Sequence, residues 1–167
     1  MQKKRIKTCV FAIFVVPLCG FLCAARITHM IIYFLFIRIA ALFGHKKAGL
    51  IVKGQRSTFR QVLHKDANTQ HLKGAIWVHV SSVGEFEQSR PLIERLRREQ
   101  PARKIVLTFF SPSGYELRKD YDKVDKVLYL PFATRRNAKA WLAAIEPSMA
   151  IFVKYEFWPA YLHALKK

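Results

Sequence analysis

The feature that most constrains the fold is an alternation of short apolar runs with amphipathic stretches from residue 74 onward. The apolar runs are rich in β-branched and aromatic residues and are bounded by glycine, serine or proline, which is typical of buried strands. They cover residues 75–80, 104–110, 124–130 and 149–153. Strands that alternate with helices predict an α/β fold, a Rossmann-like parallel sheet whose connections are right-handed.

Helical patterns fill the intervals between these runs. Pro91 is tolerated only in a first turn, so the first helix is predicted to begin near Ser89 or Arg90 and to end at Glu99, before Pro101. A short helix is expected over 115–121. Thr134 is placed to cap a helix that runs through Ile145, and a further helix is expected to start after residue 154.

Two carboxylates follow strands of this predicted sheet. Glu85 follows the first strand and Glu156 follows the fourth, so both are expected at the carboxyl edge, where ligands bind in such sheets. Each acid could simply complement a helix N-terminus, which is worth roughly 0.3–1 kcal/mol. Each could instead be a general base. Position alone slightly favours the helix-start role, but the coincidence of two acids at one edge weakens it.

Several familiar motifs are missing from the chain. There is no G-x-x-x-x-G-K phosphate loop, no G-x-G-x-x-G and no G-x-S-x-G elbow, so a nucleotide cofactor bound in the Rossmann manner is not indicated. The three cysteines all lie within the first 23 residues, and no Cys/His spacing is typical of a metal site. We therefore expect no cofactor, no metal and no disulfide framework.

The charge balance favours an anionic partner. The 167 residues include 29 Lys and Arg against 11 Asp and Glu, a formal net charge of +18. Such an excess suits nucleic acid, phospholipid headgroups or a phosphorylated substrate. Residues 44–73 form a basic stretch, interpreted as a connector with a short helix around 59–64. It is equally compatible with a solvated face and with contacts to phosphate.

The first third of the chain is interpreted as membrane-directed. Residues 1–7 are basic and 9–25 are largely apolar, which resembles a signal peptide or an anchor at the short limit for a spanning helix. Residues 31–43 are apolar except for Arg38 and are too short to span a bilayer. They are compatible with a buried helix or with a helix lying in the bilayer interface, and the basic residues that follow favour the interface.

Four stretches carry a resemblance to a known family. They are HVSSVGEFEQSRPLIERLR, LTFFSPSGYELRK, YLPFATRRNAKAWL and EPSMAIFVKYEFWPAYL. In order and spacing they resemble the N-terminal domain of 3-deoxy-D-manno-octulosonic acid (Kdo) transferase, the lipid A glycosyltransferase, and most closely its Bacteroidetes versions. The resemblance runs from about residue 31 to residue 167.

The resemblance implies a GT-B glycosyltransferase with two Rossmann-like domains. The N-terminal domain of the family receives the lipid A precursor (lipid IVA) at the cytoplasmic face of the inner membrane, and the C-terminal domain binds CMP-Kdo. By the S-V-G-E motif, Glu85 corresponds to the proton acceptor for the attacking sugar hydroxyl. By the E-[FL]-W-P motif, Glu156 corresponds to a residue that supports the transition state. The reaction implied is inverting and uses no metal.

Five further residues are predicted to contact substrate. Four lie in the turns after the first two strands and one in the basic stretch: Ser82, Gly84, Ser113, Gly114 and Arg56. Arg56 is the first choice for a phosphate contact because it closely follows a glycine in the segment that leads into the sheet.

The expected organisation has three parts. Residues 1–29 are an apolar extension, interpreted as an uncleaved anchor or a misassigned start, because a cleaved signal would export the enzyme away from CMP-Kdo. Residues 30–73 are a membrane-associated helix and basic connector, and 74–167 are the acceptor-binding domain. The donor domain is expected to lie outside this chain, so the chain by itself is expected to be an inactive fragment.

Two other functions remain open at this stage. One is a basic membrane-peripheral or anion-binding module without chemistry, although no nucleic-acid recognition motif is present. The other is a GT-B enzyme that uses a different sugar donor.

Overall fold

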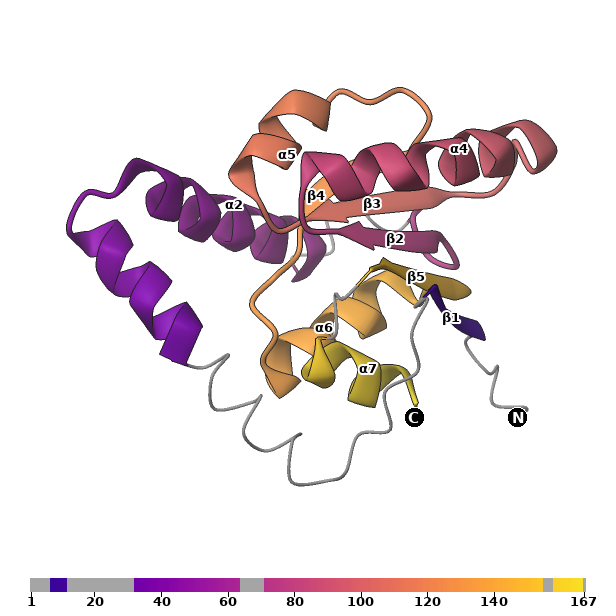
Figure 1. Ribbon diagram of the computed structural model, residues 1–167. Coiled ribbons are helices and arrows are strands. Elements are labelled where there is room, and N and C mark those ends of the chain that lie inside the picture. Colours follow the sequence, from indigo (N-terminus) through magenta and orange to yellow (C-terminus); the bar gives the residue numbers. More distant parts are fainter. Residues whose placement is uncertain (1–6, 12–31, 64–70, 155–157, 167) are drawn as a thin grey trace.

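The computed structural model describes residues 7–11, 32–63, 71–154 and 158–166. Within this part of the chain a parallel sheet has the strand order β1-β5-β2-β3-β4 (Figure 1). The strands are β1 (Lys7–Phe11), β2 (Ile76–Val80), β3 (Ile105–Phe109), β4 (Lys126–Tyr129) and β5 (Met149–Val153). The four strands expected from the sequence are therefore confirmed, with ends that differ by at most two residues.

Helices cover both faces of the sheet, as Figure 1 shows. On one face lie α4 (Val83–Glu99) and α5 (Pro112–Arg118), and on the other lie α6 (Arg135–Ile145) and α7 (Pro159–Leu165). Neighbouring strand residues enter opposite cores: Trp77 packs with Trp141 and Tyr161, whereas Val78 packs with Phe86. Burial on both faces explains why the strands are continuous apolar runs without polar alternation.

Helix α4 begins earlier than the sequence predicts. Ser82 is its N-cap and Val83 its first residue, so the predicted start near Ser89 or Arg90 is wrong. Pro91 lies inside the helix on an exposed side. The N–H that proline lacks would have bonded the Glu87 carbonyl, so one helical hydrogen bond is missing at this position. The surrounding packing tolerates the loss of one helical hydrogen bond.

The basic stretch after residue 44 is also different from the prediction. Instead of a connector with a short helix, it contains the 18-residue helix α2 (Lys46–Leu63). Its buried side is a stripe at helical spacing, formed by Ala48, Ile51, Gln55, Thr58 and Val62. Two of these five residues are polar, so the apolar periodicity that would predict a long helix from the sequence is weak.

Helix α2 protects the edge strand β4. The backbone N–H of Tyr129 donates to Thr58 Oγ1 at 3.1 Å. A Cβ atom on Gly54 would lie 2.4 Å from the Tyr129 ring, so the glycine permits the close approach of helix and strand. A side chain of α2 thus satisfies one backbone donor of an otherwise open edge.

The N-terminal expectations are tested only in part. The residues of the predicted extension that the structure describes, Lys7–Phe11, form strand β1, which pairs in parallel with β5. Residues 12–31 lie outside the described part of the chain. None of the described helices is both long enough and apolar enough to cross a bilayer.

Candidate functional site

The sheet reverses its strand order at the β2–β5 boundary. From β2 the chain adds β3 and β4 on one side, and then returns to place β5 on the other side of β2. In open α/β sheets, ligands bind beyond the carboxyl ends of the two strands that flank such a switch point. The turn after β2 contains Glu85. The other predicted acid, Glu156, lies outside the described residues.

Glu85 occupies the first turn of α4. Its backbone N–H donates to the hydroxyl of the N-cap residue Ser82 at 3.4 Å. Its carboxylate reaches back, and Oε2 accepts the backbone N–H of Ser81 at 2.5 Å. This arrangement resembles a capping box, except that the Glu85 carboxylate bonds the N–H of the residue before the N-cap instead of that of the N-cap itself. Glu85 Oε1 has no hydrogen bond to any described residue, so one oxygen is held in place and the other is left for a partner.

The turn after β3 is tied to the turn after β2. The backbone N–H of Ser111 donates to the Ser81 carbonyl at 2.9 Å. A Cβ on Gly114 would lie 2.5 Å from the Phe109 ring and 3.5 Å from the Ser82 carbonyl carbon. Gly114 is buried, so its close packing rather than ligand contact explains the absence of a side chain, whereas Ser113 is exposed.

Four of the predicted contact residues therefore come together with Glu85. Ser82 and Gly84 lie at the start of α4, and Ser113 and Gly114 lie at the start of α5, which packs beside it. Gly84 is exposed, and a Cβ atom added to it would meet no other atom within 4 Å, so the surface at this residue is open.

A buried polar network that the sequence analysis missed lies next to this site. The indole N–H of Trp158 donates to His79 Nε2 at 2.9 Å, and His79 Nδ1 lies 2.9 Å from Thr108 Oγ1. An indole nitrogen can only donate, so Nε2 must accept and the ring proton is on Nδ1, which donates to Thr108. Trp77 Nε1 donates to the same hydroxyl at 2.8 Å.

This network connects the two sides of the switch point. His79 belongs to β2 and Trp158 to the segment after β5, so their bond fixes that segment against the strand that leads to Glu85. One sequence signal could have indicated this network, namely a histidine within an apolar run. A histidine buried in a strand needs a hydrogen-bond partner, as buried polar side chains do in general.

The helix over residues 32–42 packs on aromatic residues that follow strands β4 and β5. The Phe34 ring lies 4.7 Å from the Phe132 ring and stacks on Trp158 at 6.0 Å, with an interplanar angle of 8°. The Arg38 guanidinium lies over Phe132, 5.2 Å from the ring centroid. The helix thus packs across the segments that follow β4 and β5.

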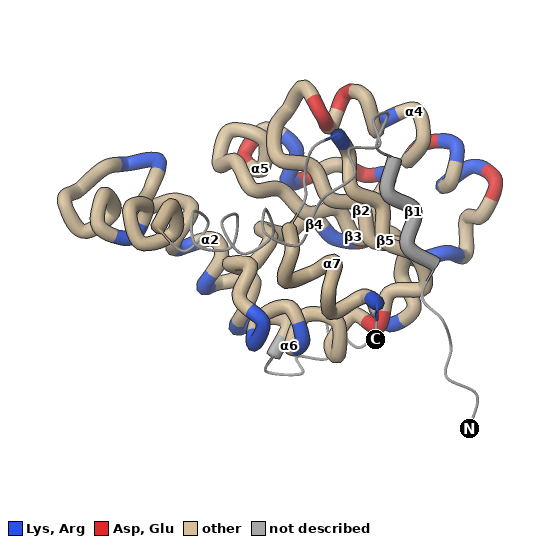
Figure 2. The backbone as a smooth tube through the Cα atoms, turned by 60° about the horizontal axis from the view of Figure 1, so that its bottom comes forward, with Lys and Arg blue, Asp and Glu red and all other residues tan. Residues whose placement is uncertain are grey.

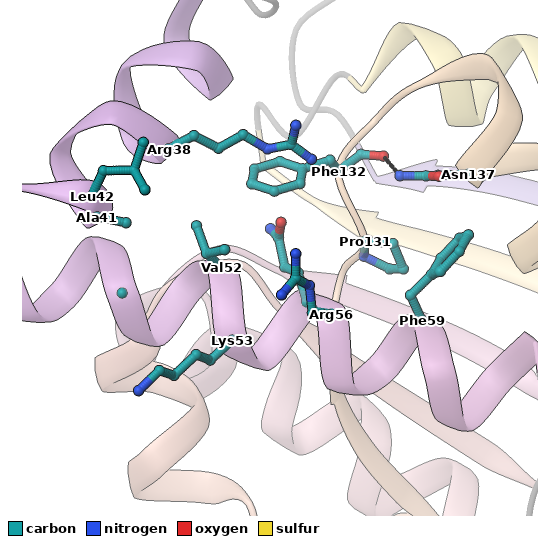
Figure 3. A pocket seen from close by; sticks show the side chains of 12 residues that line it. Arg38, Ala41, Leu42, Val52, Lys53, Arg56, Phe59, Pro131, Phe132 and Asn137 are labelled. Atoms are coloured by element: carbon teal, nitrogen blue, oxygen red, sulfur yellow. Dashed lines mark hydrogen bonds between the residues drawn. The ribbon is translucent and has the colours of Figure 1, made fainter.

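Arg56 lies apart from the other predicted contact residues. It is exposed on α2 and lines a cavity of about 620 Å³ between the helix over 32–42, α2 and the β4–α6 connection (Figure 3). No residue from the turns after β2 or β3 lines this cavity. The structure therefore divides the predicted contact residues between two places.

No metal site is found in the described ranges. They contain no group of three or more His, Cys, Asp or Glu side chains that could hold an ion. Residue types that could hold a phosphorylated ligand are present instead, in the serine and glycine turns and in the basic helix α2.

Comparison with known proteins identifies a family that the chain matches. Residues 53–167 match the family model described as 3-Deoxy-D-manno-octulosonic-acid transferase (kdotransferase). The chain is 37% identical over 92 residues to the 3-deoxy-D-manno-octulosonic acid transferase of Aquifex aeolicus (strain VF5), covering 54% of this chain and 25% of that protein.

Two more relatives carry the same name. The Haemophilus influenzae protein is 32% identical over 92 residues, which cover 54% of this chain and 21% of the relative. The Rickettsia bellii protein is 25% identical over 137 residues, which cover 81% of this chain and 31% of the relative. The chain therefore spans between 21% and 31% of the length of these curated relatives.

Proposed function

The chain belongs to the 3-deoxy-D-manno-octulosonic acid (Kdo) transferase family, and from that membership we propose that it is the acceptor-binding part of a glycosyltransferase of lipopolysaccharide synthesis. The proposed reaction transfers Kdo from CMP-Kdo to the lipid A precursor. The observation that carries the proposal is the position of Glu85, held at the carboxyl end of β2 beside the switch point, with one carboxylate oxygen that no described residue hydrogen-bonds.

Glu85 is proposed to be the general base. Its free oxygen takes the proton of an acceptor hydroxyl while the hydroxyl oxygen attacks the anomeric carbon of Kdo. The bond from that carbon to the CMP phosphate breaks, CMP leaves with the electron pair, and the configuration is inverted. The Ser81 N–H fixes the second carboxylate oxygen, so the base is oriented before the substrate arrives.

The remaining site residues have supporting roles in this proposal. Glu156 supports the transition state, and the turns that carry Ser82, Gly84 and Ser113 face the acceptor sugar. Gly114 contributes by letting α5 approach the Ser82 backbone. CMP-Kdo is held by a second domain, and neither a metal nor another cofactor takes part.

A location on the cytoplasmic face of the inner membrane is proposed from the helix over 32–42. Its buried residues Phe34 and Ile37 pack on the domain, but its other large apolar side chains are exposed. Leu42 and Phe43 are 86% and 87% exposed. The neighbouring helix α2 carries Lys and Arg but no acid, whereas Asp and Glu gather around α4 and α5 (Figure 2). An apolar face beside basic residues suits an anionic bilayer surface.

The test of the catalytic proposal is Glu85→Gln in a protein that carries this chain together with a donor-binding domain. Glutamine can keep the bond from the Ser81 N–H but cannot take a proton. Kdo transfer from CMP-Kdo should fall about 10²–10⁴-fold, while binding of the lipid acceptor changes little.

The matched control is Glu87→Gln, in the same helical turn. Glu87 pairs with Arg118 at 2.7 Å and Arg90 at 3.0 Å and has no part in the proposed chemistry. Normal turnover of Glu87→Gln with loss in Glu85→Gln supports the base. Normal turnover of Glu85→Gln would refute it.

A second candidate function is a basic, membrane-peripheral or anion-binding module without catalysis. The exposed apolar helix and the acid-free helix α2 favour it. It is distinguished by the same experiment, because such a module binds vesicles but gives no transfer with any residue at position 85.

A further inference from the structure

A second ligand pocket lies away from Glu85. The cavity between the helix over 32–42, α2 and the β4–α6 connection measures about 620 Å³. Figure 3 shows its walls, with Arg56 rising from α2, Lys53 leaving α2 at the cavity margin, Arg38 reaching in from the other helix, and Phe132 and Pro131 closing the far side.

One buried side chain in this cavity lacks partners. Gln55 is only 3% exposed, and neither its Nε2 nor its Oε1 has a hydrogen-bond partner among the described residues. Thr58, one turn further along the same buried stripe, is satisfied by the N–H of Tyr129. Buried amides are normally hydrogen-bonded, and this one lines a cavity in which a polar ligand would supply its partners.

The chemistry of the amide limits what that ligand can be. Nε2 donates and Oε1 accepts, so both are satisfied only by a group that presents an acceptor and a donor close together. A phosphate ester with a neighbouring hydroxyl meets both requirements. An inorganic ion without a proton to donate, or a simple hydrocarbon, does not.

Three cations around the cavity select for negative charge. Arg38, Lys53 and Arg56 line it, and none of them forms an ion pair with a described residue. No acidic residue occurs anywhere in the first 65 residues, so no carboxylate from this segment competes for them. Guanidinium groups match the geometry of phosphate oxygens and can donate to two of them at once.

Apolar side chains from the same elements also line the cavity and continue outward. Ala41, Leu42, Val52 and Phe59 line it together with Phe132. Leu42 is also part of the exposed apolar face of the helix over 32–42, where Phe36 is 67% exposed. A ligand in the cavity can therefore have a charged end at the cations and an apolar end toward that surface.

We propose that this cavity binds the phosphorylated sugar headgroup of a lipid, with Gln55 bonding a hydroxyl and an oxygen of the phosphate, and Arg56, Lys53 and Arg38 neutralising its charge. The inference rests on the proposed function only in taking this lipid to be the acceptor. The cavity is a binding site that holds the substrate and is separate from the reacting group at Glu85.

The test is a calorimetric titration of this chain with glucose 1-phosphate, glucose and inorganic phosphate. The sugar phosphate should bind more tightly than either part alone. Gln55→Leu and Arg56→Gln should each weaken its binding by about tenfold or more, because each removes hydrogen bonds to a charged ligand. The matched control Arg60→Gln, an exposed cation on the same helix outside the cavity, should change affinity less than about twofold. Equal losses in all three variants, or no binding of glucose 1-phosphate, would overturn the proposal.

Two further measurements separate the alternatives. Phosphatidylcholine vesicles that contain phosphatidylglycerol test for a generic lipid headgroup. If Gln55→Leu weakens vesicle binding as strongly as sugar-phosphate binding, the sugar specificity is refuted; if vesicle binding stays at the control level, it is supported. The melting temperature of the ligand-free chain should rise in Gln55→Leu, since an unpaired buried amide has been removed, and a fall would contradict the assignment of Gln55 as unpaired.

The result is independent of the catalytic test. If the wild-type chain does not bind the sugar phosphate, the proposed binding pocket is refuted, and the Glu85 experiment is unaffected. If Glu85→Gln transfers Kdo normally while sugar-phosphate binding is intact, the proposal that Glu85 is the base is refuted and the proposal of the binding pocket is retained.

Discussion

Glu85 combines a structural role with the proposed chemical one. Its carboxylate accepts the Ser81 N–H and its backbone donates to Ser82, which are bonds of a helix cap. The two roles are compatible because a cap needs only one carboxylate oxygen. The choice between cap and base that the sequence poses is therefore not exclusive, and the structure itself shows the cap.

The first prediction separates the two roles by stability. Glu85→Gln should leave the free energy of unfolding within about 0.5 kcal/mol of the wild type, since glutamine preserves the capping bond. Glu85→Ala should lower it by about 0.5–2 kcal/mol through loss of that bond. Urea unfolding followed by circular dichroism measures both. A similar loss in the two variants would show that charge at the helix N-terminus, rather than the bond to Ser81, stabilises the turn.

At the scale of elements, α2 decides how the edge of the sheet is closed. Gly54 lets the helix lie directly on the Tyr129 ring, and Thr58 bonds the backbone of the same residue. Burial raises the pKa of the Tyr129 hydroxyl well above its ordinary value, and the nearby Glu116 carboxylate and Tyr115 phenol add to the shift. The phenol thus stays neutral under the helix.

The second prediction uses two glycines of α2. Gly54→Ala would place a Cβ 2.4 Å from the Tyr129 ring and should destabilise the chain by about 1–3 kcal/mol. Gly49→Ala, with nothing within 4 Å of its Cβ position, should stabilise it by about 0.5–1 kcal/mol, because alanine is the better helix former. Thermal unfolding of both variants gives the comparison. Equal effects would mean that α2 does not pack on β4 as described.

The third prediction concerns the opposite end of the sheet, where Asp125 joins α4 to β3. Its carboxylate accepts from the Ile105 N–H at 2.8 Å, from Arg97 at 2.6 Å and from Lys104 at 3.1 Å. Burial opposes ionisation, but these donors outweigh it and hold the pKa of Asp125 below its ordinary value of 3.8. The stabilisation is therefore present above the unfolded pKa and is lost as pH falls through the lower folded value.

Asp125→Asn should accordingly lower stability by about 1–3 kcal/mol at neutral pH, and the difference from wild type should shrink at acid pH. Urea unfolding across a pH series measures this. Asp122→Asn is the control, because Asp122 is 71% exposed and pairs only with the adjacent Lys123 among described residues. A difference for Asp125→Asn that does not depend on pH would show that packing, not ionisation, is responsible.

At the scale of the whole molecule, charge and apolar exposure are unevenly distributed. The acidic residues gather around α4 and α5, while α2 is basic and lies beside the exposed apolar helix over 32–42 (Figure 2). This asymmetry is the physical basis for a preferred orientation on an anionic bilayer.

The fourth prediction tests that orientation. Replacing Phe36 and Leu42 by serine should strongly weaken flotation with phosphatidylglycerol vesicles without unfolding the chain, since the two side chains are 67% and 86% exposed. Leu117→Ser removes a 59% exposed leucine from α5 and should leave vesicle binding unchanged. Binding should also weaken with added salt. Equal effects of the two changes would exclude this face as the bilayer contact.

The sequence by itself determined the fold class, the four strands after residue 74, the turn that carries Glu85 and the family resemblance. These features are local, since a strand buried on both faces is a continuous apolar run and a capping turn is a few adjacent residues. The start of α4 was predicted wrongly because the prediction confined Pro91 to the first turn, whereas the structure begins the helix at the Ser82 cap.

Only the tertiary structure decided the rest. The full length of α2 depends on a stripe that includes Gln55 and Thr58, and Thr58 is satisfied by Tyr129, 71 residues away in the chain. The His79–Trp158 bond and the grouping of Arg38 and Arg56 around one cavity likewise join distant segments. Local patterns report what each segment buries, but a polar residue finds its partner, or lacks one, only when the segments have been brought together.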